Sequence, residues 1–305
     1  MTWTTNDIPD LSGRLAIITG ATGGLGLETA IVLAGKGAEV VLAARNSDKG
    51  AEAERLIRSR HPNAAVRFEL LDLASLASVQ AFAERHLATG RPIDILIDNA
   101  GVMALPTRQT TVDGFEMQFG TNYLSHFALV GRLLPLLIAA KARVVQLSSV
   151  AHRSGHIRLG DLNYQTHYSP WPVYQQSKLA MLMFALELQR RSDAHGWGLT
   201  SVAAHPGFAR TDLIANGHAG KPGLFARGAR LLEAVLSHSA ADGALPILMA
   251  ATLPDPTPGG YYGPTGFQEM KGPPGVAAIK PQAKDADVAR RLWSESERLT
   301  GVTYG

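Results

Sequence analysis

The chain contains no cysteine among its 305 residues. This absence excludes disulfide bonds, cysteine-ligated zinc and thiol nucleophiles, although it does not identify a cellular compartment. The fold must therefore be stabilised by packing. Hydrophobic residues make up 46% of the chain and charged residues 18%, a balance that supplies a buried core and argues against disorder.

The chain also has little excess charge and no clear metal-ligand pattern. The net charge is only +3, and the 29 Lys and Arg residues are scattered rather than gathered into a run that follows a nucleic-acid backbone. We therefore expect no nucleic-acid partner. His152 and His156 have a helical spacing, but Gly155 interrupts it and no Glu completes a zinc pattern. We expect no metal site.

Signals for a membrane are weak as well. Met1–Pro9 is polar and lacks the order of a secretion signal, and we expect that no stretch reaches the length needed to cross a bilayer. We expect a cytoplasmic protein without a transmembrane segment. Six apolar residues among basic ones predict one apolar helix face: Leu224, Phe225, Leu231, Leu232, Val235 and Leu236. We interpret this face as one that covers substrate or contacts a second subunit. Contact with a membrane surface is the alternative.

Short apolar runs alternate with longer segments of helical period, which is the order of βαβ units. The predicted strands are Leu15–Thr19, Glu39–Ala43, Val66–Leu71, Ile93–Asp98, Arg143–Ser148, Leu199–Ala204 and Gly259–Gly263. The predicted helices are Leu25–Gly35, Ser75–Leu87, Tyr123–Ala140, Val173–Arg191, His238–Leu253 and Asp285–Leu299. We predict an α/β fold, a Rossmann-type doubly wound parallel sheet of about seven strands. A single domain spans 1–305, with a substrate-covering segment at about 205–237 and a C-terminal extension at about 264–305.

A glycine-rich turn separates the first predicted strand from the first helix. Its cofactor-binding candidates are Gly20, Thr22, Gly23, Gly24, Leu25 and Gly26. In this position backbone amides approach a pyrophosphate, whose charge is favoured by the helix N-terminus. A tight turn that binds nothing is the plainer alternative. The spacing Gly-x-x-x-Gly-x-Gly resembles that of the short-chain dehydrogenase/reductase family, and the resemblance implies an oxidoreductase that uses a nicotinamide dinucleotide.

The end of the second strand bears on which dinucleotide is bound. NAD sites usually place an acid there, whereas Arg45 stands at this point and suits a 2′-phosphate, so we predict NADP(H) over NAD(H). An ordinary surface charge is the alternative. The family resemblance assigns Asp72 and Leu73 to the adenine contact. It also matches Asp98 to Gly101 with the family's Asn-Asn-Ala-Gly, which implies that Asn99, Ala100 and Gly101 contact the cofactor. Asp98 departs from the family motif, so its hydrogen bonding is left open, with a turn cap as the plainer reading.

Tyr174 and Lys178 form Tyr-x-x-x-Lys on a predicted helix, so both side chains lie on one face. An adjacent ammonium favours the phenolate, which makes Tyr174 a candidate acid/base. Ser149 ends the preceding strand, where a hydroxyl can polarise a substrate oxygen. Ser148 is the alternative, and a strand-end cap is a second one.

The family resemblance supplies the remaining site residues. It implies that Asn122 holds a water that relays protons to Lys178, with a buried amide at a helix kink as the alternative reading. It also places Pro206, Gly207 and Thr211 against the nicotinamide carboxamide. His205 we interpret as a packing histidine rather than a base.

As a set, these motifs resemble the family branch that contains retinol dehydrogenases, the WW-domain oxidoreductase and protochlorophyllide reductase. They predict interconversion of an alcohol with a ketone or aldehyde, and the apolar loops predict a bulky hydrophobic substrate. Homo-oligomers are frequent in the family. A dinucleotide-sensing regulator or a scaffold on the same fold is the alternative function, although such proteins commonly lose the Tyr or the Lys.

Overall fold

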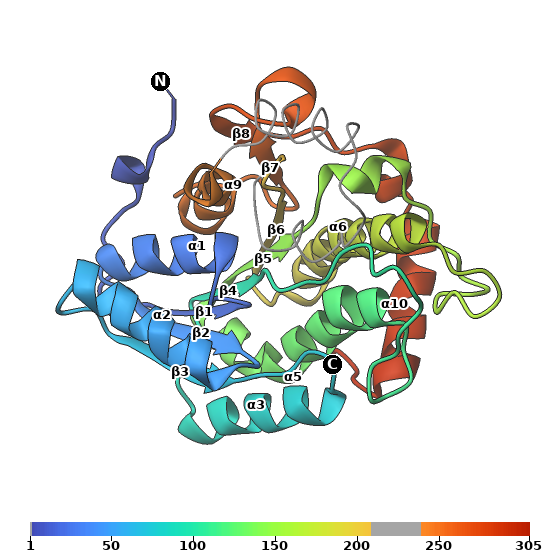
Figure 1. Cartoon of the computed structure of the whole chain (residues 1–305), viewed down its shortest axis with the longest axis horizontal. Coiled ribbons are helices and arrows are strands. Elements are labelled where there is room, and N and C mark those ends of the chain that lie inside the picture. Colours follow the sequence, from blue (N-terminus) through green and yellow to red (C-terminus); the bar gives the residue numbers. More distant parts are fainter. Residues whose placement is uncertain (1, 209–238) are drawn as a thin grey trace, which may run out of the picture.

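The computed structural model describes residues 2–208 and 239–305. Its centre is one eight-stranded sheet with the order β3-β2-β1-β4-β5-β6-β7-β8 (Figure 1). The strands are β1 (Leu15–Thr19), β2 (Glu39–Ala44), β3 (Val66–Leu70), β4 (Ile95–Asp98), β5 (Arg143–Leu147), β6 (Thr200–Ala204), β7 (Tyr261–Pro264) and β8 (Pro274–Val276). The seven predicted strands are confirmed as β1 to β7, which are parallel. The short antiparallel β8 was not predicted, because Pro-Gly-Val has no strand periodicity.

Helices cover both faces of this sheet. On one face, α3 (Leu76–Thr89), α5 (Ser125–Ala140), α6 (Pro170–His195) and α10 (Ala286–Thr300) enclose one core cluster. On the other, α1 (Gly24–Gly35), α2 (Ser47–Arg60) and α9 (Ala240–Thr252) enclose a second. Figure 1 shows α1 and α9 on the opposite side of the sheet from α3 and α5. Helix α2 was not predicted, since it buries only a narrow stripe of Gly50, Ala53 and Ile57.

The strands read as apolar runs because both of their faces are covered. All five residues of β1 are buried, with Leu15 and Ile17 in the first core cluster and Ala16 and Ile18 in the second. This alternation is the two-residue period of an extended chain. The parallel strands also bring their carboxyl ends to one edge of the sheet, and the strand order reverses between β1 and β4. A ligand crevice is expected at that point.

The approach to α5 is irregular. A short helix α4 (Met117–Phe119) leads into a π-helical turn, η2 (Gly120–Leu124), and then into α5. Within the described residues, the continuous run Met117–Ala140 is long and apolar enough to cross a bilayer, so the expectation that no stretch reaches that length is wrong. Because 67% of its most apolar window is buried inside the fold, its composition is also that of a core helix.

The C-terminal residues pack onto this same core. Trp293 of α10 lies with its ring centroid 5.0 Å from that of Phe127 in α5, and the Tyr304 hydroxyl donates to the Phe127 carbonyl over 2.6 Å. The predicted extension at about 264–305 therefore joins the main core. Most of the predicted segment at about 205–237 lies outside the described residues, as do Thr211 and the apolar set from Leu224 to Leu236. The bounds of that segment stay a prediction.

Candidate active site

A groove of about 360 Å³ opens at the carboxyl ends of β1, β2 and β4, where the strand order reverses. Twelve of the predicted cofactor residues line it, namely Gly20, Thr22, Gly23, Gly24, Leu25, Gly26, Arg45, Asp72, Leu73, Asn99, Ala100 and Gly101. Residues separated by up to about eighty positions thus form one surface because parallel strands end at one edge.

The glycine-rich turn is built for a close approach of backbone. Gly20 has φ +66, and a Cβ there would lie 2.9 Å from the Cα of Ala100. A Cβ on Gly26 would lie 2.6 Å from Asn99 Nδ2 and 2.6 Å from the Gly20 carbonyl oxygen. Helix α1 begins at this turn without a side-chain cap, so its first amides are left for a ligand. The turn therefore fits a pyrophosphate.

The end of the groove beside β2 and α2, where we predict the adenosine, carries two cations. Arg45 and Lys49 both line it, and Asp72 is the one acid among the lining residues. One oxygen of Asp72 accepts the Ala74 amide over 2.9 Å. Asn46 caps α2 by accepting the Lys49 amide over 2.9 Å, and because Asn46 also lines the groove, the N-terminus of α2 lies at the same end. Sequence analysis missed Lys49, whose only signal was its position one turn into a helix that was itself not predicted.

Tyr174, Lys178 and Ser149 come together beside this groove. Tyr174 and Lys178 lie on α6, both buried, with Lys178 Nζ 5.9 Å from the centroid of the phenol ring. Lys178 Nζ also donates to the carbonyl oxygen of Leu147 over 2.9 Å, at the end of β5. Ser149, which follows β5, lies close enough to Tyr174 that its hydroxyl lowers the pKa of the phenol, against the larger effect of burial. The structure thus joins the phenol, the ammonium and the hydroxyl that the sequence singled out.

Burial sets the protonation of this group. It raises the pKa of Tyr174 to about 12, against the opposing effect of the Ser149 hydrogen bond. It also lowers the pKa of Lys178 to about 8. The sequence argument that the ammonium favours phenolate named one effect only; in the folded protein, desolvation of the phenol is larger.

The two adjacent serines have different surroundings. The Ser148 hydroxyl donates to the Lys178 carbonyl over 2.7 Å, which ties β5 to the backbone of α6. Ser149 is half-buried and accepts the Ala151 amide over 3.2 Å as the cap of the short helix η3 (Val150–Ser154). Ser149 therefore faces Tyr174, while Ser148 serves the packing of the helix.

Asn122 lies in the π-helical turn η2, and both polar atoms of its side chain are hydrogen-bonded. Its Oδ1 accepts the Val102 amide over 2.7 Å, and its Nδ2 donates to the Val102 carbonyl and to Ser177 Oγ, each over 2.9 Å. These bonds join the kink to a loop and to α6. The predicted part of Asn122 in a proton relay stays a prediction. A Cβ on Gly101 would lie 3.0 Å from Asn122 Oδ1 and 3.5 Å from Lys178 Nζ, so these two groups also lie close together.

The residues after β6 are only partly described. Gly207 has φ +68, and a Cβ there would lie 2.3 Å from the Met270 carbonyl oxygen, so the turn after Pro206 packs against the β7–β8 connection. Neither residue lines the groove, and Thr211 lies outside the described residues. His205 is fully buried, with Nε2 3.1 Å from a Glu269 carboxylate oxygen, and burial lowers its pKa.

Asp98 does not cap a turn. It is the last residue of β4, and its side chain accepts Gln146 Nε2 over 2.7 Å in the sheet interior. The reading of a turn cap is wrong because the side chain of the last strand residue points into the packed face rather than along the chain. Within residues 2–208 and 239–305, no three His, Asp or Glu side chains are grouped as metal ligands.

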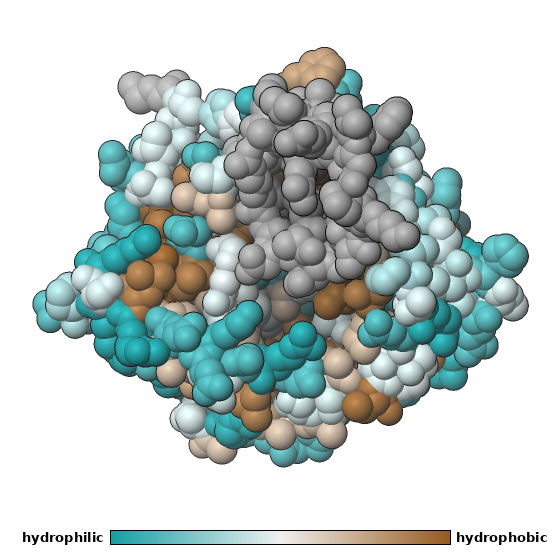
Figure 2. Space-filling model, viewed as in Figure 1, coloured by the Kyte–Doolittle hydropathy of each residue, from teal (hydrophilic) through white to brown (hydrophobic). Residues whose placement is uncertain are grey.

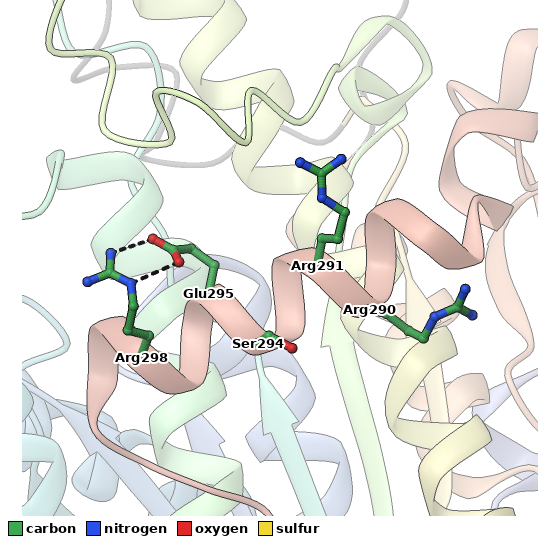
Figure 3. A pocket seen from close by; sticks show the side chains of 5 residues that line it. All are labelled: Arg290, Arg291, Ser294, Glu295 and Arg298. Carbon is green, nitrogen blue, oxygen red and sulfur yellow. Dashed lines mark hydrogen bonds and ion pairs between the residues drawn. The ribbon is translucent and has the colours of Figure 1, made fainter.

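A second hollow, of about 440 Å³, lies on the outer surface of α10 (Figure 3). Arg290 and Arg291 point in different directions there, and Arg298 is paired with Glu295. Because its cations do not converge, this hollow lacks the arrangement of a binding site.

Comparison with known proteins agrees with this geometry. The sequence pattern of the short chain dehydrogenases matches residues 14–221. Retinol dehydrogenase 13 of Homo sapiens is 42% identical over 299 residues, which cover 96% of this chain and 86% of the human protein. The chain belongs to the short-chain dehydrogenase family.

Three further proteins resemble this dehydrogenase. Polyprenol dehydrogenase of Mus musculus is 40% identical over 305 residues, covering 98% of this chain and 87% of the mouse protein. The crystal structure of an uncharacterized protein from Mycobacterium paratuberculosis shares 39% identity and a TM-score of 0.82, with 100% of both chains covered. A short chain dehydrogenase from Shigella flexneri complexed with NADP shares 25% identity and a TM-score of 0.61, covering 80% of this chain and 93% of that one.

These relatives confirm the predicted place of the dehydrogenase in the retinol dehydrogenase-like branch of the family. They also confirm an oxidoreductase fold that binds a nicotinamide dinucleotide.

Proposed function

We propose that this dehydrogenase uses NADP(H) to interconvert an alcohol with a ketone or aldehyde, and that its substrate is bulky and hydrophobic. The observation that carries the proposal is the meeting of Tyr174, Lys178 and Ser149 beside a groove that fits a dinucleotide. The relatives named for retinol and polyprenol act on large apolar alcohols, which favours a similar substrate here. Figure 2 shows apolar side chains in several separate patches on this face, set among hydrophilic ones.

The residues of the site divide the chemistry between them. When bound, the nicotinamide supplies or accepts the hydride. The hydroxyls of Ser149 and Tyr174 hydrogen-bond the substrate oxygen, and Tyr174 gives a proton to that oxygen in reduction or takes it in oxidation. Lys178, charged below pH about 8, stabilises the phenolate that this transfer leaves. Asn122 fixes the turn beside Lys178 and completes the proton path.

Turnover and its dependence on Tyr174 test this function. We expect the protein to consume NADPH, followed by its absorbance, with a panel of aldehydes and ketones of increasing apolar size. Tyr174→Phe should lower kcat by about a thousandfold or more, since it removes the proton donor, while NADP(H) binding stays near the wild-type value.

Tyr164→Phe is the matched control, because Tyr164 is also a buried tyrosine but lies outside the site. Preserved turnover in Tyr174→Phe would refute the assignment. Tight dinucleotide binding by the wild type with no turnover on any substrate would instead favour a dinucleotide-sensing protein.

The preference for NADP(H) rests on Arg45, Lys49 and the N-terminus of α2 at the adenosine end of the groove. All three favour the extra phosphate of NADP(H). Arg45→Asp should weaken NADP(H) binding by about ten- to a hundredfold and leave NAD(H) binding equal or improved, as measured by titration of dinucleotide fluorescence. Arg55→Asp, a substitution on the exposed side of the same helix, is the control. A wild type that prefers NAD(H), or an unchanged preference in Arg45→Asp, contradicts this cofactor.

A further inference from the structure

One buried histidine lies between the two halves of the site. His126 belongs to the first turn of α5, four residues after Asn122, and its side chain is fully buried. Its Nδ1 lies 2.8 Å from the main-chain carbonyl oxygen of Asn122, and its Nε2 lies 2.9 Å from Thr19 Oγ1. Both ring nitrogens therefore have partners, one on the π-helical turn and one at the end of β1.

Hydrogen-bond counting fixes the tautomer of this imidazole. Thr19 Oγ1 accepts the amides of Asn99 and Ala100, each over 2.9 Å, which uses both of its lone pairs. Its single proton must then go to an acceptor, and His126 Nε2 at 2.9 Å is better placed than the Ile97 carbonyl at 3.4 Å. Nε2 is therefore unprotonated, and Nδ1 carries the hydrogen that is donated to Asn122.

The imidazole is also neutral. Burial, with a smaller contribution from the positive charge of Lys178, lowers the pKa of His126 to about 4. A neutral ring donates at one nitrogen and accepts at the other, which the two partners require. A second proton would sit on Nε2 and make it a donor, so the Thr19 hydroxyl would lose its acceptor.

The partners of His126 belong to different parts of the site. Thr19 precedes the glycine-rich turn, and its carbonyl accepts Asn99 Nδ2 over 2.8 Å, so it fixes the turn against the end of β4. Asn122 holds Val102 and, through Ser177, the helix that carries Tyr174. The imidazole is a direct link between the cofactor turn and the turn beside the catalytic lysine.

We propose that neutral His126 is a positioning residue. Its hydrogen bonds to Thr19 and to the main-chain carbonyl of Asn122 link the glycine-rich turn that binds the dinucleotide to the turn beside Lys178. This inference rests on the proposed function for its catalytic consequence. It assigns to His126 a role that neither the Tyr-Lys-Ser grouping nor the glycine-rich turn contains.

Two substitutions separate the two bonds of His126. The amide of glutamine reaches the position of Nε2, so His126→Gln keeps the acceptor for Thr19 and loses the donor to Asn122. The shorter asparagine places its amide at the position of Nδ1, so His126→Asn keeps the donor and loses the acceptor. We expect His126→Gln to lower kcat about tenfold with NADP(H) affinity within about twofold, and His126→Asn to weaken NADP(H) binding about fivefold with a smaller loss of kcat.

The matched control is His86→Asn. His86 is also a buried histidine, lies on α3, does not line the groove, and pairs with Glu69. This variant should lose stability while keeping kcat and NADP(H) affinity near wild type. Variants at His126 that change kcat and affinity together, or no more than His86→Asn does, would overturn the proposal.

Nitrogen-15 NMR of the histidine rings gives a readout that needs neither turnover nor a cofactor. At pH 7 we expect one ring, assigned by its loss in His126→Gln, with a protonated Nδ1 and an unprotonated Nε2. The opposite tautomer or a doubly protonated ring would overturn the inference. If His126→Gln fails to fold, the ring is assigned in the wild type through its own backbone resonances, so the test stands. If the wild type turns over no substrate, the proposed function fails, while the NMR signature and the NADP(H) affinities still decide the role of His126.

Discussion

Asp98 is a fully buried carboxyl group at the end of a central strand, and its protonation has consequences for stability. Gln146 donates to one oxygen, while Asp98 Oδ1 and Gln146 Oε1 have no partner among the described residues. Burial raises the pKa of Asp98 well above its ordinary value. Protonation of Oδ1 removes the buried charge and turns one of these acceptors into a donor, so the neutral form suits this place better than the carboxylate.

We predict that Asp98→Asn stabilises the protein. The asparagine amide supplies permanently the donor that the acid supplies only when protonated, so the free energy of unfolding at pH 8 should rise by about 1–3 kcal/mol. Because the folded pKa of Asp98 is raised, its cost grows as pH increases above 3.8, so the gain should be larger at pH 8 than at pH 5.

Urea unfolding at the two pH values measures this gain. Asp113→Asn, at a residue with an exposed side chain, is the control for removing one negative charge. Equal effects of Asp98→Asn at both pH values, or a loss of stability, would contradict a buried neutral acid.

At the scale of elements, the unit that matters most is β1, its turn and α1. The turn brings the helix N-terminus to the groove only if Asn99 and the Gly20 carbonyl can lie against Gly26. The same contacts hold β1 to β4, since Asn99 Nδ2 donates to the Thr19 carbonyl over 2.8 Å. Any side chain at position 26 must push these groups apart.

Gly26→Ala should therefore weaken NADP(H) binding at least about tenfold, because the added Cβ would displace the turn from its seat on Asn99. The sheet should keep its fold, which circular dichroism would show. Gly160→Ala is the matched control, because its Cβ meets no other atom within 4 Å. Binding at the wild-type level in Gly26→Ala would mean that the turn does not seat the dinucleotide.

At the scale of the whole molecule, several histidines are buried in the neutral form. Burial lowers the pKa of His126 and of His152 to about 4, and His205 shifts in the same direction. In the unfolded chain they bind protons near the ordinary value of 6.5. Between pH 6.5 and 4 the unfolded state therefore binds more protons, and the free energy of unfolding falls as pH falls.

We predict an acid loss of stability that begins near pH 6.5, with a cost on the order of 3 kcal/mol for each of His126 and His152 by pH 4. Asp98 and Glu116, with raised pKa, oppose it, and Glu269, with a pKa lowered to about 2, acts mainly below pH 4.5. Urea midpoints at pH 7.5, 6 and 5 measure the slope. His152→Gln should flatten it, and an unchanged slope in this variant would show that the neutral histidine does not cause it.

Much of this protein could be predicted from local patterns. Strands β1 to β7 follow from apolar runs between helical segments, because both faces of a parallel sheet are covered. The Tyr174–Lys178 pair follows from helical spacing, and the turn after β1 from its glycines. Helix α2 and strand β8 were not predicted, since α2 buries only a narrow stripe of residues and β8 is three residues long.

The sequence by itself determined the order of elements, the glycine-rich turn and the residue types at the site, because each depends on neighbours a few positions away. The tertiary structure alone decided which serine faces Tyr174, where Asp98 points and that His126 links Thr19 to Asn122. Those contacts join residues as much as 107 positions apart, and the burial that sets their protonation exists only once the helices have packed on the sheet.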